Sequence, residues 1–256
     1  MTRNTWIIFT AVVVAVFGGL IYFSTRNSID VSKVNENSVL AADAQSGNIA
    51  DHVFGNPKSK VVLVEYGDYQ CPGCGSAYQP LKTASEKYKG EMAFVFRNFP
   101  LTNMHPNARA AAAVAESAGI LGKFWEMHDK LYETQDEWSG ATSEQRTKFF
   151  TSYAVSIGLD EAKFTATLKE QSETINQKIS FDTALGRKIG VDGTPGIYLN
   201  GKKVEGDVKD GKLIPSDSDS STPPVWSNIE TLEQFFLQPA FKENGVKIEE
   251  PKTKKS

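Results

Sequence analysis

The motif Cys-Pro-Gly-Cys at residues 71–74 constrains this chain most, because it holds the only two cysteines among 256 residues. A strand-type run, residues 61–66, precedes it, and a segment that favours a helix, residues 75–88, follows it. Cys71 is therefore predicted at the N-terminus of a helix, where unpaired N–H groups and the helix dipole stabilise a thiolate. The spacing places Cys74 on the same helix face, one turn further on.

Pro72 and Gly73 separate the two sulfurs, and Pro72 suits a first helical turn because its missing N–H is not needed there. A structural disulfide usually closes a longer loop, and a zinc site needs four ligands. His52, His105 and His128 lie far apart in the sequence and show no ligand spacing. The pattern therefore predicts a redox-active disulfide, with no metal and no cofactor.

Residues 4–25 carry no charge and form an apolar run long enough to cross a bilayer. Trp6, Tyr22 and Phe23 lie near its ends, as aromatic residues do at membrane interfaces. The alternative is a cleaved signal peptide, but the small-x-small site at residues 42–44 lies well beyond the run. We therefore expect an uncleaved, single-pass anchor.

The charges flanking the apolar run are balanced, so they do not set its orientation. A catalytic disulfide suits an oxidising compartment, which predicts a cell-membrane protein with its catalytic domain on the extracytoplasmic side. The whole chain has a formal net charge of −3 and no basic patch, so a nucleic-acid partner is not expected.

The order of predicted elements is strand, helix, strand, helical block, hairpin, helix. These elements cover residues 60–66, 72–88, 91–97, 106–189, 197–204 and 228–243. Within the helical block, Thr142 and Gln145 have the spacing of a capping box, and Asp160 can cap the helix that follows Gly158. The dipeptide Asn200-Gly201 predicts a two-residue hairpin turn.

This order predicts an α/β domain with a small mixed sheet, helices on both faces and an inserted helical block. The polar composition of the residues after the anchor indicates a stalk, and the lysine-rich C-terminus indicates a frayed tail. The predicted organisation is an anchor at 1–26, a stalk at 27–50, a domain at 51–243 with its insert at about 105–190, and a tail at 244–256.

The chain resembles the DsbA-like branch of the thioredoxin fold. The resemblance rests on the Cys-Pro-Gly-Cys motif after the first strand and on Gly193-Thr194-Pro195 after the helical block. Four local motifs also match: residues 51–57, 96–101, 105–108 and Phe124-Trp125-x-x-His128-x-x-Leu131. The resemblance spans about residues 51–243. The resemblance implies a thiol–disulfide oxidoreductase of the bacterial cell envelope.

The resemblance also implies residue roles. Cys71 would be the attacking and leaving sulfur and Cys74 its buried partner. Pro195 would be a cis-proline facing the disulfide, and the backbone of Thr194 would pair with a bound peptide. Glu65 would be the acidic residue beneath the pair, exchanging a proton with Cys74.

The position of Glu65 supports a buried role without the resemblance, because it interrupts an apolar strand on the face of Val61 and Leu63. A strand that feeds such a motif is usually covered on both faces, and burial there raises a carboxyl pKa. The alternative is an exposed carboxylate on an edge strand. His105 is interpreted as a helix cap, and His128, Phe124 and Trp125 as packing residues.

The predicted activity is the introduction of disulfides into exported proteins through the Cys71–Cys74 pair. The expected partners are reduced or unfolded exported clients and a membrane redox partner that restores the disulfide. One alternative is a reductase or isomerase of the cell envelope. Another is a non-catalytic holdase or assembly protein in which the pair is vestigial.

Overall fold

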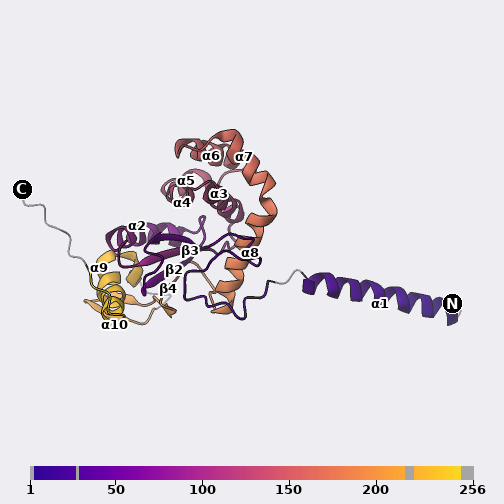
Figure 1. Cartoon of the computed structure of the whole chain (residues 1–256), viewed down its shortest axis with the longest axis horizontal. Helices are drawn as coiled ribbons and strands as arrows, with labels where there is room; N and C mark the ends of the chain where they lie inside the picture. Colours follow the sequence, from indigo (N-terminus) through magenta and orange to yellow (C-terminus); the bar gives the residue numbers. More distant parts are fainter. Residues whose placement is uncertain (1–2, 27–28, 217–221, 249–256) are drawn as a thin grey trace, which may run out of the picture.

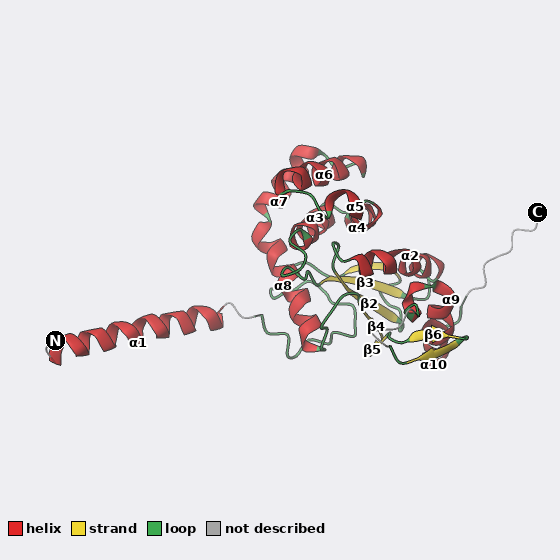
Figure 2. Ribbon diagram, turned by 180° about the vertical axis from the view of Figure 1, so that it is seen from behind, coloured by secondary structure: helices red, strands yellow, loops and turns green. Residues whose placement is uncertain are grey.

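A mixed five-stranded sheet lies at the centre of the chain, in the order β1-β3-β2-β4-β5. The computed structural model describes residues 3–26, 29–216 and 222–248 (Figures 1 and 2). β2 and β3 are parallel, and the neighbouring pairs are antiparallel. The strands are β1 (His52–Gly55), β2 (Val62–Gly67), β3 (Ala93–Asn98), β4 (Gly196–Leu199) and β5 (Lys202–Lys203).

Every residue of β2 and of β3 is buried, so the middle of the sheet is covered on both faces. The apolar, β-branched run before the cysteine motif predicts this, because strands covered on both faces carry continuous apolar sequence. The antiparallel edge strand β1 is an addition to the predicted layout.

One face of the sheet packs against α2 (Pro72–Lys87) and the C-terminal helices. Those C-terminal elements are the 3-10 turn η1 (Val225–Ser227), α9 (Ile229–Leu232), the π-helical turn η2 (Glu233–Leu237) and α10 (Gln238–Glu243). Leu63, Leu81 and Phe241 are fully buried in this layer. The predicted helices at 72–88 and 228–243 are therefore confirmed, the second as a run of short helical turns.

The opposite face packs against α8 (Ser172–Lys188) through Phe181 and Leu185. The helices between β3 and α8 in the sequence pack into a separate helical layer (Figure 1). They are α3 (Ala108–Ile120), α4 (Phe124–Glu133), α5 (Gln135–Trp138), α6 (Ser143–Ser156) and α7 (Glu161–Glu170). The fold is thus the predicted α/β sheet with an inserted helical block.

The predicted local signals are confirmed. Thr142 and Gln145 form the reciprocal capping box of α6, and the Asp160 side chain caps α7 by accepting from the Lys163 N–H. Asn200 and Gly201 both have positive φ, 48° and 79°, as a two-residue hairpin turn between β4 and β5 requires. A second hairpin, β6 (Asp207–Lys209) with β7 (Lys212–Ile214), was not predicted.

Residues 29–50 differ from the predicted stalk, because they pack along the α8 side of the sheet. The buried guanidinium of Arg97 donates to the carbonyls of Glu36 and Ser38, at 2.6 and 2.9 Å. Arg97 also pairs with Asp51 at 2.7 Å. The apolar side chains that contact the sheet layer from this segment are Ile29, Val31, Val34, Val39 and Leu40. Scattered apolar residues and carbonyl acceptors therefore dock a segment whose average composition is polar.

Helix α1 (Arg3–Arg26) extends away from the rest of the chain (Figure 1). Within the described residues, no helix combines the length and the apolar character needed to cross a membrane, so the predicted anchor is not confirmed. Part of the predicted tail, residues 249–256, lies outside the described residues, and so do residues 217–221.

Candidate active site

Cys71 is the N-cap residue of α2, and Pro72 occupies the first helical turn, as predicted. The thiol of Cys71 is buried and lies 3.4 Å from the carbonyl oxygen of Thr194. A hydrogen bond from the Cys74 thiol, helped by the backbone N–H groups of Gly73 and Cys74, outweighs burial and lowers the pKa of Cys71 to about 5. Cys71 is therefore a thiolate at neutral pH in the reduced protein.

Cys74 lies one turn deeper and has no exposed surface. Burial is the main cause that raises the pKa of its thiol well above the ordinary value. The backbone N–H of Asp68 lies 3.5 Å from its sulfur. The two cysteines are free, buried thiols of opposite character, one ionised at the start of α2 and one protonated a turn deeper.

Glu65 lies on the α2 side of β2, on the face predicted from Val61 and Leu63. It is only 1% exposed, and its Oε1 has no hydrogen-bond partner among the described residues. Burial, followed by the charge of Cys71, raises the pKa of Glu65 to about 8. Glu65 is therefore mainly protonated at neutral pH and can exchange a proton with a neighbouring group.

Thr194 and Pro195 precede β4, and the peptide bond between them is cis. The active-site loop approaches them closely at Gly73. A Cβ at Gly73 would lie 3.3 Å from Pro195 Cδ, 3.5 Å from the Thr194 carbonyl oxygen and 3.6 Å from Cys71 Sγ. The structure thus brings four residues of the predicted site together beside Cys71: Pro72, Gly73, Thr194 and Pro195.

The buried carboxylate of Asp68 was not predicted in the site. It accepts a hydrogen bond from the Leu101 N–H at 2.8 Å and contacts Nδ1 of His105 at 2.7 Å. His105 was predicted to cap a helix, but Asn107 occupies the N-cap position of α3. That prediction was wrong, because the nearby buried carboxylate binds the imidazole. The only sequence signal for this contact is an acidic residue just before the cysteine motif.

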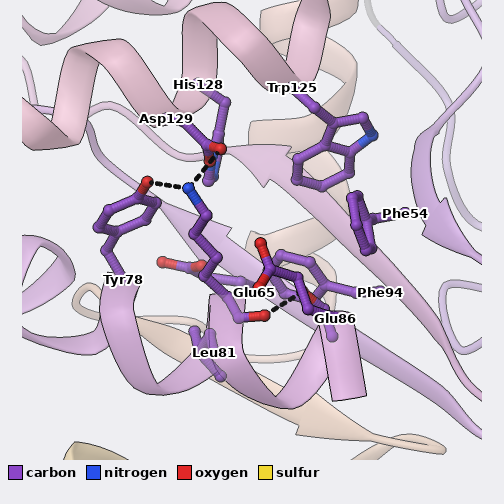
Figure 3. Close-up of a pocket in the computed structure, with 11 residues that line it drawn as sticks. Phe54, Glu65, Tyr78, Leu81, Glu86, Phe94, Trp125, His128 and Asp129 are labelled. Carbon is purple, nitrogen blue, oxygen red and sulfur yellow. Dashed lines mark hydrogen bonds and ion pairs between the residues drawn. The ribbon is translucent and has the colours of Figure 1, made fainter. Parts of the chain in front are cut away.

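A narrow cavity of about 20 Å³ opens beside Glu65 between β2, α2 and α4 (Figure 3). It brings together residues that the sequence analysis treated separately. The lining residues are Phe54, Glu65, Tyr78, Leu81, Lys82, Ser85, Glu86, Phe94, Trp125, His128 and Asp129. His128, interpreted as a packing residue, is buried in an aromatic cluster but also reaches this cavity. Within the described residues, no cluster of His, Cys, Asp or Glu suits a metal ion.

The fold and the unequal cysteine pair define a thioredoxin-fold chain with a redox-type motif. A model of the family described as "Thioredoxin" matches residues 47–213, which is more than half of the chain. The chain therefore belongs to the thioredoxin family.

Two relatives show how the chain compares with whole proteins. The Na(+)/H(+) antiporter NhaA 1 of Mycobacterium sp. (strain KMS) is 34% identical over 166 residues, which are 64% of this chain and 26% of the antiporter. The chain thus spans about a quarter of the length of such relatives. The probable disulfide bond formation protein D of Bacillus anthracis is 27% identical over 208 residues, covering 78% of this chain and 88% of that protein.

Two solved structures share the fold. BdbD from Bacillus subtilis, in its oxidised form, superposes with a TM-score of 0.57 at 21% identity, covering 81% of this chain and all of that one. The thiol-disulfide exchange protein alpha-DsbA2 from Wolbachia pipientis gives a TM-score of 0.54 at 24% identity, covering 62% of this chain and 81% of that one. The predicted DsbA-like fold is confirmed, and the predicted class, a thiol–disulfide oxidoreductase, agrees with these relatives.

Proposed function

We propose that this chain introduces disulfide bonds into exported proteins through the Cys71–Cys74 pair. The observation that carries the proposal is the opposite character of the two thiols. The pKa of Cys71 is lowered to about 5, whereas that of the buried Cys74 is raised. A low-pKa thiolate is a good leaving group and stabilises the reduced form of the pair, and these properties favour oxidation of a client.

Each step balances in bonds and protons. A client thiolate attacks Cys71 Sγ, the Cys71–Cys74 bond breaks, and Cys74 leaves with the electron pair. The Cys74 thiolate takes a proton from Glu65, because the pKa of Cys74 is raised well above its ordinary value and thus lies above the pKa of Glu65, which is about 8. The second client thiolate then attacks the client sulfur of the mixed disulfide, and Cys71 leaves as a thiolate. The client is oxidised and the cysteine pair is reduced.

The residues around Cys71 suit the intermediate. The carbonyl of Thr194 faces the sulfur, and Pro195 lies against the loop at Gly73, so an extended client could pair with the Thr194 backbone beside the mixed disulfide. Recycling requires an oxidant that accepts two electrons from the reduced pair, for which we propose a membrane redox partner.

The full-length protein, reduced client and glutathione buffers test the direction of the reaction. We expect a reduction potential between about −120 and −230 mV, the span from strong oxidants to glutaredoxins. A value near that of thioredoxin, about −270 mV, would support a reductase instead. Cys71→Ser should abolish exchange. With oxidised glutathione of the buffer as the oxidant, Cys74→Ser should accumulate a mixed disulfide between Cys71 and the client, because no second enzyme thiol is present to resolve it. Exchange that survives Cys71→Ser would refute the assignment.

We also propose that residues 4–25 anchor the chain with its catalytic domain on the extracytoplasmic side. The proposal rests on the uncharged apolar run and on the compartment that a catalytic disulfide needs. In intact cells stripped of any outer envelope, added protease should degrade the domain, and an impermeant thiol reagent should label the reduced pair. A shortened, released form would show cleavage near Ala44. Full protection would place the domain in the cytoplasm and contradict the oxidase direction.

A further inference from the structure

Glu65 and His128 line the same narrow cavity from opposite elements, β2 and α4 (Figure 3). Each side chain contributes a buried polar atom without a hydrogen-bond partner among the described residues, Glu65 Oε1 and His128 Nε2. Buried polar atoms are nearly always paired with protein or with ordered water. The cavity volume of about 20 Å³ has room for one water molecule. These features suit a water that joins Glu65 to His128.

The other nitrogen of His128 fixes its tautomer. Nδ1 lies 3.2 Å from Oδ1 of Asp129. Burial would raise the carboxyl pKa of Asp129, but hydrogen bonds from His128 and Lys82 outweigh it and the pKa is lowered. Asp129 is therefore an ionised carboxylate that accepts a hydrogen bond from Nδ1–H. Burial also lowers the pKa of His128, which keeps the ring neutral. A neutral ring protonated at Nδ1 presents the lone pair of Nε2.

Asp129 connects this pair to the solvent. Its second oxygen accepts from Nζ of Lys82 at 2.8 Å, and Lys82 also donates to the hydroxyl of Tyr78 at 3.0 Å (Figure 3). The side chains of Lys82 and Asp129 are 27% and 30% exposed, whereas His128 is 3% exposed. The chain Glu65, His128, Asp129 therefore runs from the core to water.

We propose that His128 and Asp129 relay protons between solvent and Glu65, forming the outer half of the path that serves Cys74. When Cys74 leaves as a thiolate and takes the proton of Glu65, a buried carboxylate remains. In the disulfide form the His128 ring carries its proton on Nε2, so it passes that proton through the cavity water to Glu65, while Nδ1 takes a proton from bulk water through Asp129. This transfer restores the Nδ1–H tautomer of the reduced protein. In recycling, the proton of Cys74 leaves by the same groups in reverse. This inference rests on the oxidoreductase function proposed above.

Other titratable or charged groups surround the path. Tyr69 and Tyr132 pack against the His128 ring, and their hydroxyls have no hydrogen-bond partner in the described part of the chain. Burial raises the pKa of both, so they serve only as neutral hydroxyls. The other titratable groups near Glu65 and His128 come from five places in the fold. They are Cys71 at the N-cap of α2; Cys74, Tyr78, Lys82 and Glu86 from α2; Asp129 and Tyr132 from α4; Asp68 and Tyr69 from the loop after β2; and His52 from β1 with Glu116 from α3.

The test compares His128→Gln with His52→Gln as a matched control. His52 is also a largely buried histidine paired with a carboxylate, Glu116 at 2.8 Å, and it stacks on Phe124, but it does not line the cavity. Oxidation of a reduced dithiol peptide by each full-length variant is followed from pH 5 to pH 9, in water and in deuterium oxide. Unfolding by urea is measured for both variants.

A group that transfers protons contributes about 10²–10⁴-fold to a rate, and bulk water would replace part of this, so we expect about a tenfold fall for His128→Gln. The fall should follow pH and carry a larger solvent isotope effect than in the wild type. Asp129→Asn should behave similarly, and adding Glu65→Gln to His128→Gln should give no further loss. His52→Gln should keep the wild-type pH profile.

Identical pH profiles and isotope effects for His128→Gln and His52→Gln would refute the relay. A fall that is independent of pH and matches a loss of folding stability would also refute it, because it would assign His128 a packing role alone. Additive losses in the Glu65→Gln, His128→Gln double variant would mean separate roles. A wild-type protein without any exchange activity would refute the proposed function itself, which is a distinct result.

Discussion

Glu65→Gln should stabilise the folded protein at neutral and alkaline pH, because it removes a carboxyl group that must stay protonated in the core. The folded pKa of about 8 lies above the ordinary 4.5. Stability from this group is therefore fully present below pH 4.5 and is lost as the pH rises toward 8. Between these values the unfolded chain has released the proton and the folded chain retains it.

The magnitude follows from that difference. The free energy of unfolding of the wild type should fall, relative to the glutamine variant, by about 1.4 kcal/mol for each pH unit in this window. The accumulated difference is about 5 kcal/mol at pH 8 and above. Glutamine has nearly the same shape, so packing differences should be small and independent of pH.

The assay is urea unfolding of the two proteins in their reduced forms at several pH values between 5 and 9. Over most of this window Cys71 is ionised and Cys74 is protonated in both proteins, so neither cysteine changes its charge between pH 6 and pH 8. The conversion of Glu86, an exposed residue at the same cavity, to glutamine is the control. A difference between wild type and Glu65→Gln that does not change with pH would show that the Glu65 carboxylate is solvated, and the proton-exchange role would fail.

Three further outcomes are expected. The thiolate absorbance of Cys71 should titrate with a midpoint near 5 in the reduced protein, and a midpoint near 9 would contradict this prediction. Because the pKa of Cys71 is lowered in the folded protein, its contribution to stability is present at high pH and is lost as the pH falls toward 5. Removal of residues 29–50 takes two carbonyl acceptors from the buried Arg97 and should lower the free energy of unfolding by about 3–6 kcal/mol. An unchanged midpoint of urea unfolding would show that the segment contributes nothing to stability. Gly67→Ala places a Cβ 2.3 Å from the Phe96 ring and should cost about 1–3 kcal/mol, whereas a thermal midpoint equal to that of the wild type would show that the ring moves freely.

The sequence predicts this site well where neighbouring residues determine the outcome. A strand, a cysteine and a proline in succession are enough to place Cys71 at the start of α2, since helix initiation depends on a few adjacent residues. Alternation along the strand likewise places Glu65 on the α2 side of the sheet.

Contacts between distant segments were not predictable in the same way. His128 lies 63 positions after Glu65, and only the packing of α4 on the sheet brings both to one cavity. Helical spacing indicates that His128 points inward, but it does not indicate which nitrogen finds a partner. His105 was misassigned for the same reason, because its partner Asp68 precedes the cysteine motif.

The segment at residues 29–50 shows a limit of average composition. Its polar residues suggested a stalk, yet a few apolar side chains pack on the sheet while backbone carbonyls satisfy Arg97. Backbone acceptors exist in every sequence, so nothing in the segment itself marks it as the partner of a buried guanidinium.

The docked segment would also affect how the reactive sulfur is oriented if α1 anchors the chain as proposed. Residues 29–40 lie on the α8 side of the sheet, whereas α2, which begins beside Cys71, lies on the other side. Any surface that holds helix α1 is therefore linked to the domain through its α8 side rather than through the α2 side. Because residues 29–40 are packed on the domain, both the distance of Cys71 from such a surface and its orientation depend on the fold, and less on the length of a flexible linker.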